Sequence, residues 1–520
     1  MTPLARTTNS DLGTGEFDLL VIGGGITGAG IARDAALRGL SVALVDGGDF
    51  GSGTSSRSSR LIHGGLRYLE HRRFGLVAES LRERGVLLRL APNLVRTIDF
   101  VLPFFRGDRV PGWKIRLGLS LYDLLAGRGN VRPHKGLGKR AVQEAEPLLR
   151  TRGLKGGALY VDAQCDDARL TVAVVRGAAA AGARVANYRQ VIDLLRDRDQ
   201  VRGALIRDGL NGGEIEVRAR LVVNATGPWA DELRRLEDPA AAPLLRPTRG
   251  SHVQVPRSRI GNRHAILFTS PIDRRTMFVL PWGDWAYIGT TEVDTTEPPG
   301  EARPTDAEIV YLLRSANSLF PDARLAHEDI VASWAGIRPL LAADPAVPAA
   351  QVSREHRIHR GSGGMLTVAG GKLTTFRVMA EHLVDRAVKE LGLPARSGRS
   401  RTEPLPGGEG AAGLALRGPG AALGLPEKTI EYLRRHYGTE TSQIYGYCRE
   451  DTFLARPLCS SHPAIGAQVR FAVEREFART AADVLERRIR LTTETPDAGA
   501  AARPAVETLM ARYFPGHEDD

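Results

Sequence analysis

Near its N-terminus the chain contains the stretch FDLLVIGGGITGAGIARDAALRGLSVALVD, residues 17–46. The apolar run Phe17–Ile22 predicts a strand, the alanine-rich stretch that ends near Arg38 predicts a helix, and Ser41–Asp46 predicts a second strand. A strand, a helix and a strand in this order form a right-handed unit whose two strands are parallel. The stretch therefore predicts an α/β fold built on a parallel sheet.

The turn between the first strand and the helix has the pattern GxGxxG, here GGGITG over residues 23–28. Gly23 permits a tight turn, Gly25 lets a pyrophosphate approach the backbone, and Gly28 lets the helix and the strand pack closely. The free N–H groups at the start of the helix attract phosphate. Asp46, at the end of the second strand, is placed to accept a hydrogen bond from a ribose. Together these features predict a dinucleotide site.

The segment after the second strand favours a flavin over an exchangeable nicotinamide nucleotide. Residues 51–60 read GSGTSSRSSR and are followed by LIHGGLRY, residues 61–68. A permanently bound flavin needs hydroxyl and backbone donors along its phosphates and its ring edge, and this loop supplies them. Arg57 and Arg60 add positive charge, and we expect one or both to meet phosphate. The sequence therefore predicts FAD as the cofactor.

Length and composition limit the remaining possibilities. A chain of 520 residues is too long for one core and predicts two or three domains. The longest stretch without a charged residue, Leu19–Ala32, has 14 residues, fewer than the roughly 20 of a membrane-spanning helix. Met1–Gly15 lacks the apolar core of a signal peptide and is expected to be a loose tail. Three scattered cysteines exclude a disulfide framework and favour a reducing, cytoplasmic setting.

The chain is basic, with a formal net charge of +11, and 64 of its 71 positive residues are arginine. Such an excess indicates either a nucleic acid or anionic surface as partner, or a general overuse of arginine. The arginines are spread over the whole chain, and no nucleic-acid-binding motif accompanies them. We therefore expect no nucleic-acid partner.

The chain beyond the first unit predicts three parts. The first is a FAD-binding domain within residues 16–395, and its main pieces are 16–75, 150–235 and 335–395. The second is a substrate domain with an antiparallel sheet, inserted mainly as residues 76–149 and 236–334. Residues 396–426 are rich in Gly and Pro and predict a linker. Residues 427–520 predict a helical domain, with helices at Glu427–Tyr437 and Ala464–Leu491.

Several blocks of the sequence resemble the FAD-dependent glycerol-3-phosphate dehydrogenase family, and they occur in the order found in that family. The blocks are TSSRSSRLIHGGLRYLEH (54–71), NATGPW (224–229), GSH (250–252), IGTT (288–291), GIRPL (336–340) and GGKLTT (370–375). The resemblance covers roughly residues 16–490. It implies a glutathione-reductase-like FAD-binding Rossmann domain, an inserted antiparallel β substrate domain like that of D-amino-acid oxidase, and a C-terminal α-helical domain.

The same resemblance implies which residues hold FAD. Asp46 stands where the family usually has Glu, so it would serve the ribose with a shorter reach. The implied cofactor-binding residues are Gly23, Gly25, Ile26, Thr27, Gly28, Asp46, Thr54, Ser55, Ser58, Leu61, His63, Gly64, Val191, Ala225, Thr226, Gly227, Leu373 and Thr374.

The implied reaction oxidises sn-glycerol 3-phosphate to dihydroxyacetone phosphate by hydride transfer from C2 to the flavin. A phosphorylated alcohol requires cations for its dianion, and arginine pairs bidentately with phosphate. Arg67 and Arg338 lie beside Gly or Pro turns in otherwise apolar blocks and are the first candidates, with Arg354 as a third. Tyr68 and Thr291 are expected to contact the substrate beside them.

Proton removal from the C2 hydroxyl requires a base, and a histidine suits that step. His252 is the first candidate and His63 the second. Lys372, in the loop Gly370–Thr375 that enters a helix, would stabilise charge on the reduced flavin or contact the substrate phosphate. His252, Arg338 and Lys372 are therefore the expected catalytic residues.

The family passes its electrons to membrane quinone and lies on the inner face of the membrane. Trp113–Leu125 would meet an anionic membrane surface through Lys114 and Arg116. The alternative is that this segment is a buried helix of the substrate domain. A homodimer is a further expectation. Two other functions stay open: a soluble oxidase that forms H2O2 from O2, and a flavin- and RNA-binding protein without dehydrogenase activity.

Overall fold

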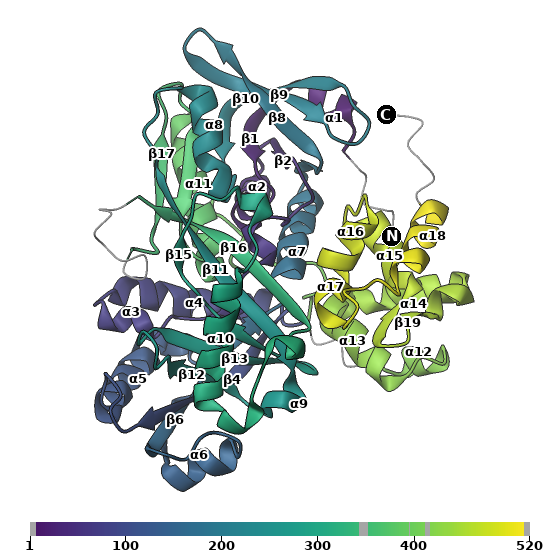
Figure 1. Ribbon diagram of the computed structural model, residues 1–520. Helices are drawn as coiled ribbons and strands as arrows, with labels where there is room; N and C mark the ends of the chain where they lie inside the picture. The colour runs from purple at the N-terminus through teal and green to yellow at the C-terminus, as the bar shows by residue number, and fades with distance from the viewer. Residues whose placement is uncertain (1–6, 343–351, 395, 411–416, 514–520) are drawn as a thin grey trace.

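The computed structural model describes residues 7–342, 352–394, 396–410 and 417–513, and Figure 1 shows their arrangement. Two large sheets form the body, and a helical C-terminal domain lies beside them against α7 (Asp167–Ala180). None of the helices in the described ranges is long and apolar enough to span a bilayer. The expected three-part α/β architecture is confirmed.

The first sheet contains the predicted unit. Its central strand β1 (Glu16–Ile22) pairs in parallel with β2 (Val42–Val45) and with β10 (Glu214–Asn224). Between β1 and β2 runs α2 (Ile26–Leu37), which packs between α7 and α11 (Phe376–Glu390). The other strands are β7 (Arg184–Ala186), β8 (Arg189–Asp197), β9 (Gln200–Asp208), β17 (His356–Arg360) and β18 (Leu366–Gly370). Because β1, β2 and β10 are parallel, their carboxyl ends meet at one edge of the sheet.

The second sheet is largely antiparallel and forms the substrate domain. Its strands are β3 (Leu61–Ile62), β4 (Val95–Phe105), β5 (Lys135–Gly138), β6 (Leu154–Cys165), β11 (Leu245–Pro256), β12 (Ala265–Thr269), β13 (Thr276–Trp282), β14 (Trp285–Gly289), β15 (Val293–Asp294) and β16 (Ala332–Leu341). The expected domain boundaries were wrong here, because β3, β6 and β16 belong to this sheet. β6 pairs along β4, and β16 pairs along β11 from Leu245 to Gln254. These long pairings draw the strands out of the spans expected for the FAD domain.

Further helices pack on the two sheets and form the C-terminal domain. Around the body they are α1 (Asn9–Gly13), α3 (Arg67–Glu70), α4 (Phe74–Leu90), α5 (Gly112–Ala126), α6 (Lys139–Ala145), α8 (Ala230–Glu237), α9 (Arg257–Ile260) and α10 (Asp306–Leu319). In the C-terminal domain they are α12 (Arg417–Ala422), α13 (Glu427–Tyr437), α14 (Thr441–Glu450), α15 (Gly466–Arg475), α16 (Ala481–Asp483), α17 (Leu491–Glu494) and α18 (Arg503–Tyr513), with a small hairpin of β19 (Pro457–Cys459) and β20 (His462–Ile465).

Three local expectations need correction. The tail is partly ordered, since α1 packs against β10 and buries Leu12. The linker packs onto the body, because the Ser400 hydroxyl donates to Asp34 over 2.5 Å and Leu405 is buried. The single helix expected over residues 464–491 is interrupted after α15. Phe477 has a φ of 60°, which an α-helix does not accommodate.

Candidate active site

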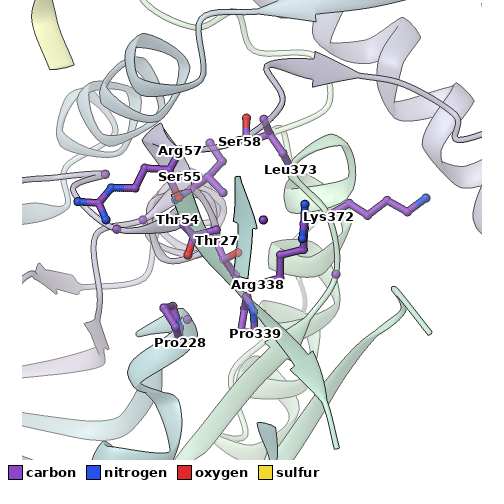
Figure 2. Close-up of a pocket in the computed structure, with 18 of the residues that line it drawn as sticks. Thr27, Thr54, Ser55, Arg57, Ser58, Pro228, Arg338, Pro339, Lys372 and Leu373 are labelled. Carbon is purple, nitrogen blue, oxygen red and sulfur yellow. The ribbon is translucent and has the colours of Figure 1, made fainter. Parts of the chain in front are cut away.

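A cavity of about 1200 Å³ lies where the carboxyl ends of β1, β2 and β10 meet the second sheet. From the first sheet it is lined by Ile22, Asp46 and Ala225, which follow or end those three strands. From the second sheet it is lined by His252 on β11 and Arg338 on β16. Figure 2 shows the hydroxyl side chains of the loop at Thr54–Ser58 and, across from them, Arg338 around this space. Ligands bind at this edge of parallel sheets in many α/β proteins.

The glycine turn leaves room for a phosphate group at the start of α2. Gly23 has a φ of 106°, and a Cβ there would lie 2.6 Å from the carbonyl oxygen of Ala225. A Cβ at Gly28 would overlap the Gly23 carbonyl, so Gly28 serves the packing of helix on strand, as expected. The backbone N–H of Ile26 donates to the Ser55 hydroxyl over 2.9 Å. The turn therefore fits a pyrophosphate that approaches the helix N-terminus.

Asp46 lies at the end of β2 and lines the cavity. Its carboxylate accepts hydrogen bonds from the backbone N–H of Gly24 (2.6 Å) and of Gly48 (2.8 Å). Burial raises its pKa to about 6, so it is mostly ionised at neutral pH. An oriented carboxylate at this point fits the ribose of a dinucleotide.

The hydroxyl-rich loop is held in place by polar contacts to both domains. The Thr54 hydroxyl donates to the Ile337 carbonyl over 2.6 Å, and Ser58 donates through its backbone N–H (2.9 Å) and its hydroxyl (2.7 Å) to Asp167. Arg57 lines the cavity. Arg60 is different, because its guanidinium is fully buried and stacks over an aromatic group made of Trp282, Tyr287 and Trp334. Arg60 is therefore turned away from any cavity phosphate.

Most of the residues expected to bind FAD line this one cavity. Those that do are Gly23, Gly25, Ile26, Thr27, Asp46, Thr54, Ser55, Ser58, Leu61, His63, Val191, Ala225, Thr226, Gly227, Leu373 and Thr374. Gly64 differs from the expectation. Its N–H donates to the Tyr122 hydroxyl over 2.9 Å, and a Cβ on it would lie 2.7 Å from Leu81, so it faces α4 and α5.

The expected arginines converge at the other end of the cavity. Arg338 is positioned by hydrogen bonds to the Thr291 carbonyl (3.2 Å) and the Thr290 hydroxyl (2.8 Å). Burial lowers its pKa to about 10, so it stays charged at neutral pH. Arg67 and Arg354 line the cavity beside it. Three guanidinium groups on one wall fit a multiply charged anion.

The sequence did not reveal Glu292, which lies among these arginines. It forms an ion pair with Arg354 and lies 3.8 Å from Arg67. Its side chain is 5% exposed. Although burial opposes its ionisation, Arg338, Arg354 and Arg67 hold the pKa of Glu292 below its ordinary value. The only available signal was its place directly after the IGTT block.

Thr291 does not present its side chain to the cavity. Its hydroxyl donates to Glu308 over 2.7 Å and accepts from the Ser251 N–H over 2.9 Å. It acts on the site through its carbonyl, which holds Arg338. The expected substrate contact through Thr291 therefore needs correction, since a buried hydroxyl is satisfied by its nearest partners.

His252 is buried at the centre of the wall formed by β11. Its Nε2 lies 2.9 Å from the Ser59 hydroxyl, and its ring stacks on Trp334 with 5.2 Å between ring centres. Among the described residues Nδ1 has no hydrogen-bond partner. Burial, together with Arg338 and Arg60, lowers the pKa of His252 to about 3. The imidazole is therefore neutral, and Ser59, which lines the cavity, connects it to that space.

His63 and Lys372 flank this wall. His63 lines the cavity, and burial with the nearby Lys372 lowers its pKa to about 3. The Lys372 ammonium lies 3.1 Å from the Ser80 hydroxyl and 4.0 Å from the ring centre of Tyr68. In Figure 2 its side chain extends away from the hydroxyl cluster. Burial lowers the pKa of Lys372 to about 7, so binding of an anion nearby would favour its charged form.

Comparisons with known proteins agree with this geometry. Residues 18–386 match the family model "FAD dependent oxidoreductase", and residues 399–519 match "C-terminal domain of alpha-glycerophosphate oxidase". Glycerol-3-phosphate dehydrogenase 2 of Mycobacterium tuberculosis is 39% identical over 508 residues, which cover 96% of this chain and 85% of the relative. The mitochondrial glycerol-3-phosphate dehydrogenase of Homo sapiens is 36% identical over 519 residues, with 96% and 71% covered.

A solved structure is similar over nearly the whole chain. It is the glycerol-3-phosphate dehydrogenase of Bacillus halodurans complexed with FAD, with a TM-score of 0.82, 32% sequence identity, and coverage of 98% of this chain and 93% of that one. The glycine cradle, the ribose carboxylate and the hydroxyl loop of the present chain fit the same cofactor. The chain therefore belongs to the family of FAD-dependent glycerol-3-phosphate dehydrogenases.

Proposed function

We propose that the protein oxidises sn-glycerol 3-phosphate to dihydroxyacetone phosphate and passes the electrons to a membrane quinone. The observation that carries the substrate is the charge of the arginine wall. Arg67, Arg338 and Arg354 supply three positive charges and Glu292 supplies one negative charge, so two positive charges remain. That balance matches the dianion of a phosphate monoester.

The residues around the wall divide the remaining tasks of the reaction. Arg338 binds and orients the phosphate, which places the C2 hydroxyl toward the wall that carries Ser59 and His252. The neutral imidazole of His252 takes the hydroxyl proton, directly or through the Ser59 hydroxyl. Bound FAD supplies the hydride acceptor. Burial and the charge of Arg338 both lower the pKa of His252. A substrate anion bound at Arg338 offsets that charge, and the pKa of His252 therefore rises when substrate binds.

The electron acceptor separates two versions of this function. A quinone-linked enzyme reduces a soluble quinone analogue in the presence of glycerol 3-phosphate and consumes little oxygen. An oxidase consumes oxygen and releases peroxide at a comparable rate. Parallel assays of purified protein with the quinone analogue and with air-saturated buffer distinguish the two. Rapid peroxide formation without quinone reduction would contradict the proposed acceptor.

Replacing Glu292 by glutamine should make the arginine wall less selective. In the unaltered protein, added anions compete with the Glu292 carboxylate for the arginines, and the variant removes this competition. Inorganic phosphate and sulfate should therefore inhibit about tenfold more strongly, as expected for a neighbouring charge worth roughly 1–2 kcal/mol. Inhibition constants for both ions check this result. Glu297→Gln, which removes a carboxylate paired with Arg249 outside the wall, is the control. Equal inhibition of the Glu292 variant and the unaltered protein would contradict the role.

The membrane partner is supported by α5. Three of its apolar side chains are exposed, Trp113 at 68%, Leu117 at 64% and Leu124 at 76%. At 100° per residue they lie within about 40° of one another, with Lys114 and Arg116 on either side. The opposite face buries Leu119, Tyr122 and Ala126, so that face packs on the protein and the exposed face is the one available to a membrane. We propose that this face lies on an anionic lipid surface on the cytoplasmic side.

The double replacement Leu117→Asp and Leu124→Asp should reduce binding to vesicles by about tenfold or more, because charge replaces the inserted apolar area. Co-sedimentation with phosphatidylcholine vesicles, with and without phosphatidylglycerol, measures the bound fraction. Val310→Asp on α10, which is 51% exposed, is the matched control. Unchanged vesicle binding in the double variant would remove α5 from the membrane contact.

A further inference from the structure

One short segment of the C-terminal domain contacts the two loops that line the cofactor end of the cavity. These are the loop that follows β2 and the hydroxyl-rich loop, and we call them the cofactor loops. The segment comprises residues 484–494, VLERRIRLTTE, and ends in α17. It contains Arg487, Arg488 and Arg490, whose side chains are 9%, 0% and 3% exposed. In Figure 1 it belongs to the part of the C-terminal domain beside α7. Buried arginines of this kind need anionic partners on the other side of the interface.

The first partner is Asp49, in the loop that follows β2. Arg488 donates to both of its carboxylate oxygens (2.6 and 2.8 Å), and Arg487 donates through Nε over 2.5 Å. Asn187 adds a hydrogen bond of 3.0 Å. The Asp49 side chain is 0% exposed, yet the two arginines hold its pKa below the ordinary value. The carboxylate is therefore ionised and depends on the C-terminal domain for its charge partners.

This loop is also the wall of the cofactor cavity. Asp46 and Gly51, on either side of Asp49, line the cavity. The ring of Phe50 packs so closely on Gly24 of the glycine turn that a Cβ on Gly24 would overlap it. The ring of Phe50 packs edge-to-face on Phe477 of the C-terminal domain, with 5.7 Å between centres. The loop is thus held between the glycine turn and the C-terminal domain.

The second partner is Asp167, at the start of α7. Arg490 lies 3.1 Å from its carboxylate and donates to the Ser56 carbonyl over 3.4 Å. The same Asp167 accepts the two hydrogen bonds of Ser58. The hydroxyl-rich loop is therefore tied to the C-terminal domain through Asp167 and through its own backbone.

We infer that residues 484–494 are part of the structure that retains FAD. They lock the two cofactor loops through the pairs of Asp49 with Arg487 and Arg488, and of Asp167 with Arg490. Glu486 and Arg487 themselves line the cavity, so the segment also closes its wall. This assigns the helical domain a role in holding the cofactor, and that role does not depend on which substrate is oxidised.

The test is the rate at which FAD leaves the protein. Arg488→Met removes the bidentate partner of Asp49 with little change in side-chain volume. Loss of one partner of a buried pair is strongly destabilising, so we expect FAD release to accelerate by at least about tenfold. Absorbance retained on diafiltration, and the Kd of the stripped protein for added FAD, measure the change. An unchanged rate would overturn the inference.

The matched control is Glu440→Gln. Glu440 forms the bidentate pair with Arg176 of α7 (2.5 and 2.7 Å), which joins the same two domains away from both loops. We expect FAD release from this variant to stay within about twofold of the unaltered protein, since distant pairs act independently. Equal losses in both variants would show that domain docking in general, rather than the loop contacts, retains FAD, and would overturn the inference.

A measurement on the unaltered protein covers the case in which Arg488→Met does not fold. Coupling between sites is reciprocal, so FAD should stabilise the segment that stabilises its site. Amide hydrogen exchange of residues 484–494 should be at least about tenfold slower with FAD than in the stripped protein. Exchange of α14, which packs on α13 and α15, is the internal reference. Equal exchange of the segment in both forms would contradict the inference.

Discussion

Replacing Arg338 by alanine should raise the KM for glycerol 3-phosphate about a hundredfold or more while the protein remains yellow. Arg338 is half-buried and charged, and two hydrogen bonds aim its guanidinium into the cavity that it lines. A charge-assisted pair with phosphate at such a site, once broken, costs about 3–5 kcal/mol. Steady-state kinetics and the visible flavin spectrum measure the two parts of the prediction.

Two further variants test whether the change in KM comes from the guanidinium of Arg338. Arg338→Lys keeps the charge but loses the bidentate fork, so its KM should lie between those of the unaltered protein and the alanine variant. Arg259→Ala removes an arginine paired with Asp329 on the surface of the same domain and should leave KM unchanged. If Arg338→Ala retains a normal KM, Arg338 does not bind the substrate.

His252→Ala should slow anaerobic flavin reduction by about 10²–10⁴-fold, the range usual for loss of a general base, with little change in substrate affinity. The neutral ring has one nitrogen bonded to Ser59 and is held by stacking on Trp334. Stopped-flow measurement of flavin reduction at several substrate concentrations separates rate from affinity.

His264→Asn is the matched control, because His264 lies in the same domain, pairs with Glu146 and is not part of the cavity wall. His63→Asn is made in parallel, since His63 also lines the cavity as a neutral imidazole. A normal reduction rate in His252→Ala together with a slow rate in His63→Asn would reassign the base. Because the base must be unprotonated, the rate in the unaltered protein should fall as the pH drops through the pKa of the bound complex.

The fold was predictable where the local sequence and the tertiary structure require the same backbone conformation. GGGITG between two apolar runs permits few structures other than the observed turn between β1 and α2, since Gly23 has a φ of 106° and Gly28 meets backbone. The domain boundaries were less predictable. β6 and β16 are apolar runs like those of the first sheet, and only their long-range pairing with β4 and β11 assigns them to the second.

The site was predictable for residues inside recognisable motifs and not for those that act on them. Arg338 and His252 stand in blocks that resemble the family, whereas Glu292 becomes visible only when three arginines surround it in space. The contact of Arg488 with Asp49 joins residues 439 positions apart. No local pattern encodes such a contact, because its physical basis is the mutual burial of two charges.

The central claim is that one cavity brings a bound FAD and the arginine wall together, so that glycerol 3-phosphate reduces the flavin directly. The most direct measurement is anaerobic titration of the purified protein with glycerol 3-phosphate while the visible flavin absorbance is followed. The account predicts stoichiometric bleaching by glycerol 3-phosphate and none by glycerol, which lacks the phosphate that Arg338 binds. A flavin that stays oxidised with excess glycerol 3-phosphate, or that glycerol bleaches equally well, would contradict it.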